Sequence, residues 1–247
     1  ATPIPRTLAL TAYGDMEISR IDEKPAGRKP IETILVPKNK IEDMVAGLIR
    51  KIRDEHAQIY WVCPLVEESE MLDLAAAEER YDVLKSIVGD RVGLVHGRMK
   101  AADKDIVMQK FAAGDLDILV ATTVIEVGVN VPNATIMVIE HAERFGLAQL
   151  HQLRGRVGRS DLQSHCILLY GNPLSVTGKA RLKIMRDTED GFVIAEEDMR
   201  LRGIGDILGT RQSGMADYML ADLSVHGDLV AMARSEAQLI VQKDPRL

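Results

Sequence analysis

Residues 117–140 read DILVATTVIEVGVNVPNATIMVIE, and they contain two short apolar runs separated by polar residues and a glycine. The runs are 118–121 (ILVA) and 136–139 (IMVI), and neither alternates apolar with polar side chains. Strands without alternation are typical of a parallel sheet that helices cover on both faces. We therefore expect both runs to be central strands of such a sheet.

Short apolar runs alternate with amphipathic segments along the whole of 31–170. This alternation is typical of repeated strand–helix units, so the sequence predicts an α/β fold with a parallel sheet and helices on both faces. The expected strands are 32–36, 58–63, 91–95, 117–121, 135–140 and 164–170. A helix is expected between the first two strands, because apolar residues recur there at helical spacing: Ile41, Met44, Val45, Leu48, Ile49 and Ile52.

The pattern changes after about residue 172, where glycines punctuate short helical pieces and no further strand–helix unit follows. From this pattern we expect an appended helical and loop element, with a final helix near 223–242. The chain starts at Ala1 without a methionine, which suggests a piece of a longer protein.

The composition is that of an ordinary globular protein, because 46 % of the 247 residues are hydrophobic and 28 % are charged. The net charge of −6 argues against a histone-like nucleic-acid binder, although a motor needs only one basic track. Cys63 and Cys166 stand far apart with no CxxC, so we expect no metal site and no disulfide, and a cytoplasmic location. No apolar run reaches about eighteen residues, the length that spans a membrane.

The most specific motif is QLHQLRGRVGR at 149–159. Arg156 and Arg159 are three residues apart, so on a helix they would project from the same side, and Gly155 and Gly158 would open that side to close approach. A solvated basic helix is the alternative interpretation.

The arrangement QxxGRxGR resembles motif VI of superfamily 2 helicases, at Gln152, Gly155, Arg156, Gly158 and Arg159. The resemblance implies a RecA-like motor lobe whose arginines reach across a cleft to the γ-phosphate of ATP held by a partner lobe. Arg159 would be the arginine finger, with Arg156 and Gln152 as its catalytic companions and Gly155 beside the nucleotide. Such a finger contributes about 10³- to 10⁵-fold to turnover.

Residues 121–134, ATTVIEVGVNVPNA, resemble helicase motif V. The hydroxyls of Thr122 and Thr123 follow a strand end and can hold a nucleic-acid phosphate without reading sequence. Ordinary turn chemistry is the alternative. The resemblance implies nucleotide contacts at Gly128 and Asn130, although many family members carry Asp where Asn130 stands.

The stretch 96–99, HGRM, directly follows the strand ending at Val95 and resembles motif IVa. In that family the loop contacts the DNA backbone, which implies nucleic-acid contacts at His96 and Gly97. The alternative is a hydrogen-bonded histidine with a structural role.

The sequence contains no G-x-x-x-x-G-K-[ST] phosphate loop. The nearest miss is 178–180, GKA, with Pro173 in place of the first glycine. Two apolar-then-acid runs, 136–140 and 193–198, imitate a Walker B strand, and we interpret both as structural. ATP with Mg²⁺ would therefore be held mainly by a first motor lobe that this sequence lacks.

Two further stretches narrow the family. Residues 1–10, ATPIPRTLAL, resemble motif III of the RecG and transcription-repair coupling families, and residues 60–70, YWVCPLVEESE, resemble the RecG motif IV region.

Residues 181–214 resemble the translocation motif of those two families. The resemblance implies that Arg181, Arg202 and Gln212 lock a helical hairpin and a loop together, with help from Arg200. GTRQSG at 209–214 favours RecG, whereas Ile204 departs from the usual RGPG.

The resemblance implies three parts: 1–30 as the end of the preceding motor lobe and a linker, 31–172 as the second RecA-like lobe, and 173–247 as the translocation hairpin, loop and C-terminal helix. It implies a lobe of an ATP-dependent DNA helicase that drives branch migration at stalled forks and Holliday junctions. Its partners would be branched DNA and the missing wedge domain and first lobe, and the chain would be inactive alone. The alternatives are a transcription-repair coupling translocase and a non-catalytic DNA-binding scaffold; a Rossmann domain is disfavoured because no G-x-G-x-x-G follows a predicted strand.

Overall fold

The computed structural model describes residues 29–64, 70–122, 131–202 and 227–244. Their elements are β1 (Ile31–Pro37), η1 (Lys38–Lys40), α2 (Ile41–Glu55), β2 (Gln58–Val62), α3 (Glu70–Val88), β3 (Val92–Val95), α4 (Ala101–Ala113), β4 (Ile118–Ala121), β5 (Ala134–Glu140), η2 (Ala142–Arg144), α5 (Leu147–Arg154), β6 (Ser164–Tyr170), α6 (Val176–Asp187), α7 (Gly191–Arg202) and α9 (Gly227–Lys243). The chain divides after Asp190 into two compact units, so the sheet unit and the unit containing α7 and α9 are described separately.

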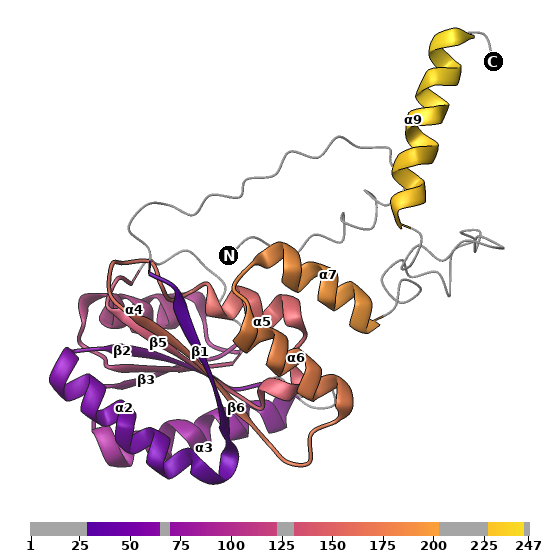
Figure 1. Ribbon diagram of the computed structural model, residues 1–247. Coiled ribbons are helices and arrows are strands. Elements are labelled where there is room, and N and C mark those ends of the chain that lie inside the picture. The colour runs from indigo at the N-terminus through magenta and orange to yellow at the C-terminus, as the bar shows by residue number, and fades with distance from the viewer. Residues whose placement is uncertain (1–28, 65–69, 123–130, 203–226, 245–247) are drawn as a thin grey trace. The chain divides into compact units, whose positions relative to one another are not determined.

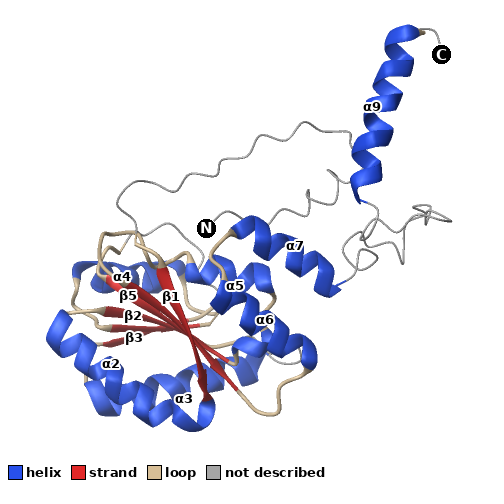
Figure 2. Ribbon diagram, viewed as in Figure 1, coloured by secondary structure: helices blue, strands red, loops and turns tan. Residues whose placement is uncertain are grey.

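The six strands form one sheet in the order β1-β6-β5-β2-β4-β3, and every neighbouring pair is parallel (Figure 2). All six predicted strands are confirmed, and so is the parallel α/β fold. β4 and β5 lie inside the sheet and are buried at every position, as their lack of alternation predicted.

Helices cover both faces of the sheet, with α2 and α3 on one side and α4 and α5 on the other (Figure 1). The core beneath α2 and α3 contains Val45, Leu48 and Leu84 against alternate residues of the interior strands, among them Trp61 and Val138. The intervening residues point to the opposite face, where the Tyr60 ring packs on the Phe111 ring of α4 with 5.0 Å between centroids. Burial on both faces explains why these strands carry no polar alternation.

Three helices follow β6 among the described residues. α6 belongs to the same compact unit as the sheet and contacts β1 and η2. α7 and α9 belong to the second unit. The residue range of α9 agrees with the helix expected near 223–242 to within a few residues. The domain boundaries given above remain predictions.

None of the helices in the described ranges is both long and apolar enough to cross a lipid bilayer.

A buried polar network ties the end of β5 to α3. The Glu140 carboxylate accepts a hydrogen bond from the Trp61 indole Nε1, with 3.0 Å between the atoms, and a second from Arg80 Nε. The Arg80 guanidinium also lies 5.4 Å from the Trp61 ring centroid. Glu140 ends the apolar-then-acid run at 136–140, and these contacts engage its carboxylate in holding the fold together.

We expect Glu140→Ala to lower the free energy of unfolding by about 3 kcal/mol, because it leaves the Trp61 N–H and the Arg80 guanidinium without their acceptor. Urea unfolding followed by the fluorescence of the single tryptophan measures this change. The exposed Glu79 on α3 supplies the control, since Glu79→Ala should change stability by less than about 0.5 kcal/mol. Equal midpoints for the two variants would contradict the network.

Candidate functional site

The motif VI segment lies at the end of α5 and in the turn that follows it. α5 ends at Arg154, and Gly155 caps it by donating its N–H to the His151 carbonyl oxygen at 3.0 Å. Arg156 and Arg159 therefore lie beyond the helix, and the expectation that they project from one helical face is wrong. The helix already ends at Gly155, whose φ of −71° and ψ of 0° depart from helical values, and Gly158, with a left-handed φ of +73°, then turns the chain before Arg159.

The turn that carries the two arginines is pressed against the amino ends of the sheet. A Cβ on Gly158 would lie 2.8 Å from the Cδ1 and Cγ1 atoms of Ile31, the first residue of β1. Ser160 Oγ donates a hydrogen bond to the Pro132 carbonyl oxygen, just before β5, at 3.0 Å. With Val157 buried between the arginines, the backbone of the turn is fixed at several points.

The side chains of Arg156 and Arg159 are partly exposed. Neither guanidinium forms a hydrogen bond or ion pair with another residue in the part of the chain that the structure describes. Burial raises the pKa of the Tyr60 hydroxyl, and the positive charges of Arg159 and Arg156 partly oppose that rise. Two guanidinium groups with free donors suit an anion such as a phosphate. Gln152 is exposed on α5.

Arg154, which the sequence interpretation left without a role, is one of the most buried side chains, with 2 % exposed. Its Nη1 donates to the carbonyl oxygens of Met185 and Thr188 at 2.7 and 2.9 Å. The same nitrogen lies 3.3 Å from Thr33 Oγ1, and Nη2 lies 3.1 Å from His151 Nδ1. Its position could have been found from the sequence, since Arg154 continues the stripe of Leu147, Leu150 and His151 at helical spacing.

A second group of expected site residues lies at the carboxyl ends of β3 and β4. His96 follows β3, Thr122 follows β4, and the Thr122 N–H donates to the Val95 carbonyl oxygen at 3.3 Å. His96 Nδ1 and Thr122 Oγ1 are buried, and neither has a hydrogen-bond partner among the described residues. The carbonyl oxygen of Gly97 accepts from Lys104 Nζ at 3.1 Å.

The remaining expected contacts of motif V, at Thr123, Gly128 and Asn130, lie outside the described residues.

The structure therefore places His96 and Thr122 together at the carboxyl ends of the strands. Arg156 and Arg159 lie at the amino ends of the strands. The first pair follows strand ends, whereas the arginine turn adjoins the starts of β1 and β5. Because all the strands run in the same direction, residues that follow strands and residues that precede strands lie at opposite ends of the sheet.

The residues expected to couple translocation are only partly described. Arg181 on α6 donates from Nη1 to the Phe145 carbonyl oxygen, just before α5, at 2.8 Å, and its buried Nε has no partner among the described residues. Arg200 pairs with Glu197 of the same helix at 2.7 Å. Arg202 is the last residue of α7, but its side chain, Gln212 and Ile204 lie outside the described residues.

The near-miss to a phosphate loop has a structural role. The Gly178 N–H donates to Ser175 Oγ at 3.0 Å, which caps the amino end of α6. The second apolar-then-acid run, 193–198, is helical within α7. In the described ranges, no group of three or more His, Cys, Asp or Glu side chains could hold a metal ion.

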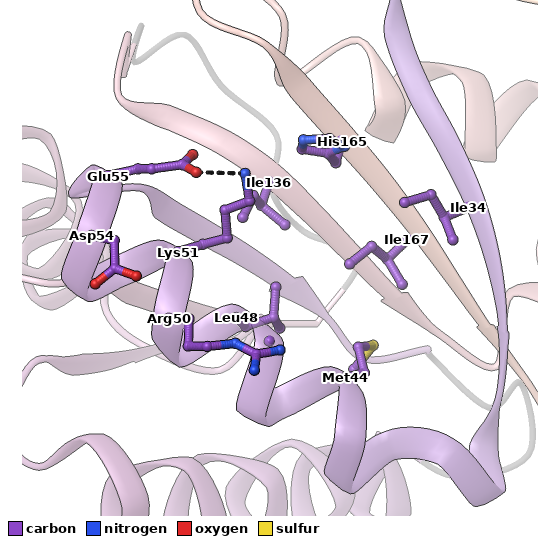
Figure 3. Close-up of a pocket in the computed structure, with 11 residues that line it drawn as sticks. Ile34, Met44, Leu48, Arg50, Lys51, Asp54, Glu55, Ile136, His165 and Ile167 are labelled. Atoms are coloured by element: carbon purple, nitrogen blue, oxygen red, sulfur yellow. Dashed lines mark hydrogen bonds and ion pairs between the residues drawn. The ribbon is translucent and has the colours of Figure 1, made fainter.

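A pocket of about 430 Å³ lies between α2 and the sheet (Figure 3). Ile34, Ile136 and Ile167 contribute apolar side chains from three neighbouring strands, and the Lys51–Glu55 ion pair of α2 stands at its side with 2.6 Å between Nζ and Oε1. None of the expected site residues lines this pocket.

Two family models match the chain. One, the helicase conserved C-terminal domain, matches residues 39–161, and the other, described as ATP-dependent DNA helicase RecG, domain 3, C-terminal, matches residues 188–247. ATP-dependent DNA helicase RecG of Escherichia coli (strain K12) is 52 % identical over 247 residues, which are 100 % of this chain and 36 % of that protein. The RecG of Bacillus subtilis (strain 168) is 51 % identical over 99 % of this chain and 36 % of its own length.

A solved structure, described as RecG bound to a three-way DNA junction, superimposes with a TM-score of 0.70. It is 44 % identical and covers 93 % of this chain, while the chain covers 30 % of that protein. This chain thus spans about a third of the length of the relatives it matches. These relatives favour RecG over the transcription-repair coupling alternative.

Both models, the identity along the whole chain and the parallel sheet with its arginine turn lead to one conclusion: the chain belongs to the RecG family, in which it represents the conserved helicase C-terminal domain and the C-terminal part of domain 3.

Proposed function

We propose that this chain is the C-terminal motor lobe of an ATP-dependent DNA helicase, and that it lends Arg159 and Arg156 to ATP held mainly by the first motor lobe. The observation that carries the proposal is the pair of guanidinium groups without a partner among the described residues, on a turn fixed against Ile31 and Pro132. A free donor pair on a rigid turn is the arrangement that an arginine finger needs, since its position is set before the phosphate arrives.

The chemistry assigned to these side chains is electrostatic. Arg159 donates hydrogen bonds to the γ-phosphoryl oxygens as negative charge spreads over them, and Arg156 adds a second cation beside it. We assign Gln152 and the backbone at Gly155 to the same nucleotide. Mg²⁺ would be held by the first lobe, because this sequence lacks the phosphate loop, and it would supply positive charge that offsets the charge of the phosphates.

We further propose that the opposite edge of the sheet contacts the DNA backbone. His96 Nδ1 and Thr122 Oγ1 are buried polar atoms without a partner in the described ranges, and a phosphate oxygen or a bound water would satisfy them. We assign Gly97 and Thr123 to the same backbone contact, and Gly128 and Asn130 to the nucleotide. Contacts of this kind position a duplex without reading its sequence.

The proposed substrate is branched DNA, at stalled forks and Holliday junctions. Support comes from the related RecG structure, which is described as bound to a three-way DNA junction. The wedge domain and first lobe would be supplied by the rest of the same protein, and residues 1–30, 31–172 and 173–247 would be the linker, the lobe and the translocation appendage. We keep a cytoplasmic location as part of this proposal.

The purified 247-residue chain should show no ATP hydrolysis above background, with or without fork DNA, because it carries the finger and not the phosphate loop. A coupled phosphate-release assay with Mg²⁺ measures this, with the full-length protein as the positive control. DNA-stimulated ATP hydrolysis by the chain alone would contradict the proposal that the first motor lobe holds the ATP.

In the full-length protein, Arg159→Ala should lower kcat for ATP by about 10³- to 10⁵-fold while the nucleotide Kd changes by no more than about threefold. The loss falls on turnover because the finger acts on charge that develops only in the transition state. Steady-state kinetics and fluorescent-nucleotide titration separate the two quantities. Arg53→Ala is the matched control, since Arg53 is exposed on α2 and, among the described residues, forms an ion pair only with its neighbour Asp54. Parallel loss of binding and turnover in Arg159→Ala would indicate a folding role instead.

Arg202→Ala and Gln212→Ala should each uncouple ATP hydrolysis from branch migration in the full-length protein. Hydrolysis should stay within about threefold of wild type, while fork unwinding per ATP consumed falls by about tenfold or more, as expected when a device that transmits motion is lost. Lys179→Ala, at an exposed position of α6, should leave the ratio unchanged. An unchanged ratio in both test variants would contradict the translocation assignment.

A further inference from the structure

Arg154 connects two segments that the chain separates by about thirty residues. At one end it is the last residue of α5, and Gly155 to Arg159 follow it directly. At the other end its guanidinium binds the carbonyl oxygens of Met185 and Thr188, at the carboxyl end of α6. α7 begins at Gly191, three residues after Thr188. One buried side chain therefore holds both the start of the arginine turn and the segment that leads into α7.

The partners of Arg154 are suited to a cation without a carboxylate. The last carbonyl groups of a helix have no partner within it and carry partial negative charge, so the end of α6 attracts a guanidinium. No ion pair within 4 Å joins Arg154 to another described residue, although the charge of the Glu189 carboxylate acts on the guanidinium and partly opposes the lowering of the Arg154 pKa by burial. The neighbouring Cys166 supplies no counter-charge, because burial raises the pKa of its thiol to about 12 and keeps it neutral. Burial also disfavours the charged form of Arg154 and so lowers the pKa of its guanidinium, but an arginine remains protonated near neutrality.

The planar fork of the side chain matters as much as its charge. Nη1 serves Met185, Thr188 and Thr33, while Nη2 faces His151 Nδ1, so the contacts extend to α5, α6 and β1. A lysine ammonium is a single point and cannot reach acceptors on three elements in one geometry. The guanidinium therefore fixes the orientation of α6 relative to the end of α5.

Arg181 provides a second tie between the same two elements. Its Nη1 binds the Phe145 carbonyl oxygen just before α5, whereas Arg154 binds the end of α6 from the end of α5. Contacts at both ends of α5 hold the two helices in fixed register. A displacement of the arginine turn is then carried to the end of α6.

We propose that Arg154 is a positioning residue that joins the Arg156–Arg159 turn to the chain entering α7, so that the response of the turn to nucleotide reaches the translocation appendage. The inference rests on the function proposed above. Arg154 touches neither nucleotide nor DNA in this role and acts through the turn and through α6. A residue with only a structural role would lower stability and leave the ratio of unwinding to hydrolysis unchanged.

The test uses the full-length protein with Arg154→Gln and Arg154→Lys, and Arg186→Gln as the matched control on α6. Arg186 is exposed, and within the part of the chain that the structure describes it forms an ion pair only with its neighbour Asp187. We expect fork unwinding per ATP hydrolysed to fall by about tenfold in Arg154→Gln and less in Arg154→Lys, because displacements near 1 Å can cost up to about 10²-fold. KM for ATP should stay within about twofold, and the control should match wild type in both quantities.

Amide hydrogen exchange supplies a readout independent of turnover. In Arg154→Lys, exchange should rise together in 155–159 and 185–188, and it should rise in neither segment in Arg186→Gln. If Arg154→Gln does not fold, Arg154→Lys decides the question by the same ratio and the same exchange data.

A lower melting temperature with a wild-type ratio in the folded Arg154 variants would overturn the proposal. That failure is distinct from failure of the proposed function. Wild-type ATP turnover in Arg159→Ala would contradict the arginine-finger assignment, independently of the Arg154 results. Loss of turnover in Arg159→Ala, together with a wild-type ratio of unwinding to hydrolysis in the Arg154 variants, would overturn only the positioning role of Arg154.

Discussion

The structure depends on one constraint, the burial of a parallel sheet on both faces. Each strand–helix unit must cross from the carboxyl ends of the strands back to the amino ends, so residues after strands and residues before strands separate in space. His96 and Thr122 follow β3 and β4, whereas the arginine turn precedes β6 and adjoins the starts of β1 and β5. The topology alone therefore places the proposed DNA contacts and the proposed nucleotide contacts at opposite ends of the strands.

Two buried charged groups organise the two faces of this sheet. Under α3, Glu140 receives the Trp61 indole and the Arg80 guanidinium, which makes a charge-balanced network at the end of β5. Beside α5 and α6, Arg154 is satisfied mainly by carbonyl oxygens at a helix end. The first network stabilises packing between β5 and α3, while the second holds the start of the arginine turn to α6.

The strands could be predicted because apolar runs without alternation leave few alternatives, as at 118–121 and 136–139. The geometry of Arg156 and Arg159 could not, because helical spacing says nothing of Gly158, whose left-handed φ and contact with Ile31 are properties of the fold. The burial of Arg154 was missed although its helical spacing from Leu147 and Leu150 indicates it, because a basic residue inside a charged motif resembles a solvated one; its partners on α6 could not be predicted from spacing. The roles of Thr123, Gly128, Asn130 and Gln212 remain predictions, since these residues lie outside the described ranges.

The separation of the two edges has an electrostatic consequence. β4, with four residues, spans about 13 Å at about 3.3 Å per residue, which exceeds the Debye length of about 8 Å at physiological ionic strength. Exposed charges at one edge are therefore largely screened from those at the other. DNA phosphates beside His96 would have little direct influence on the electrostatic potential at Arg159. Coupling between DNA binding and the arginine turn would therefore have to pass through the packed strands.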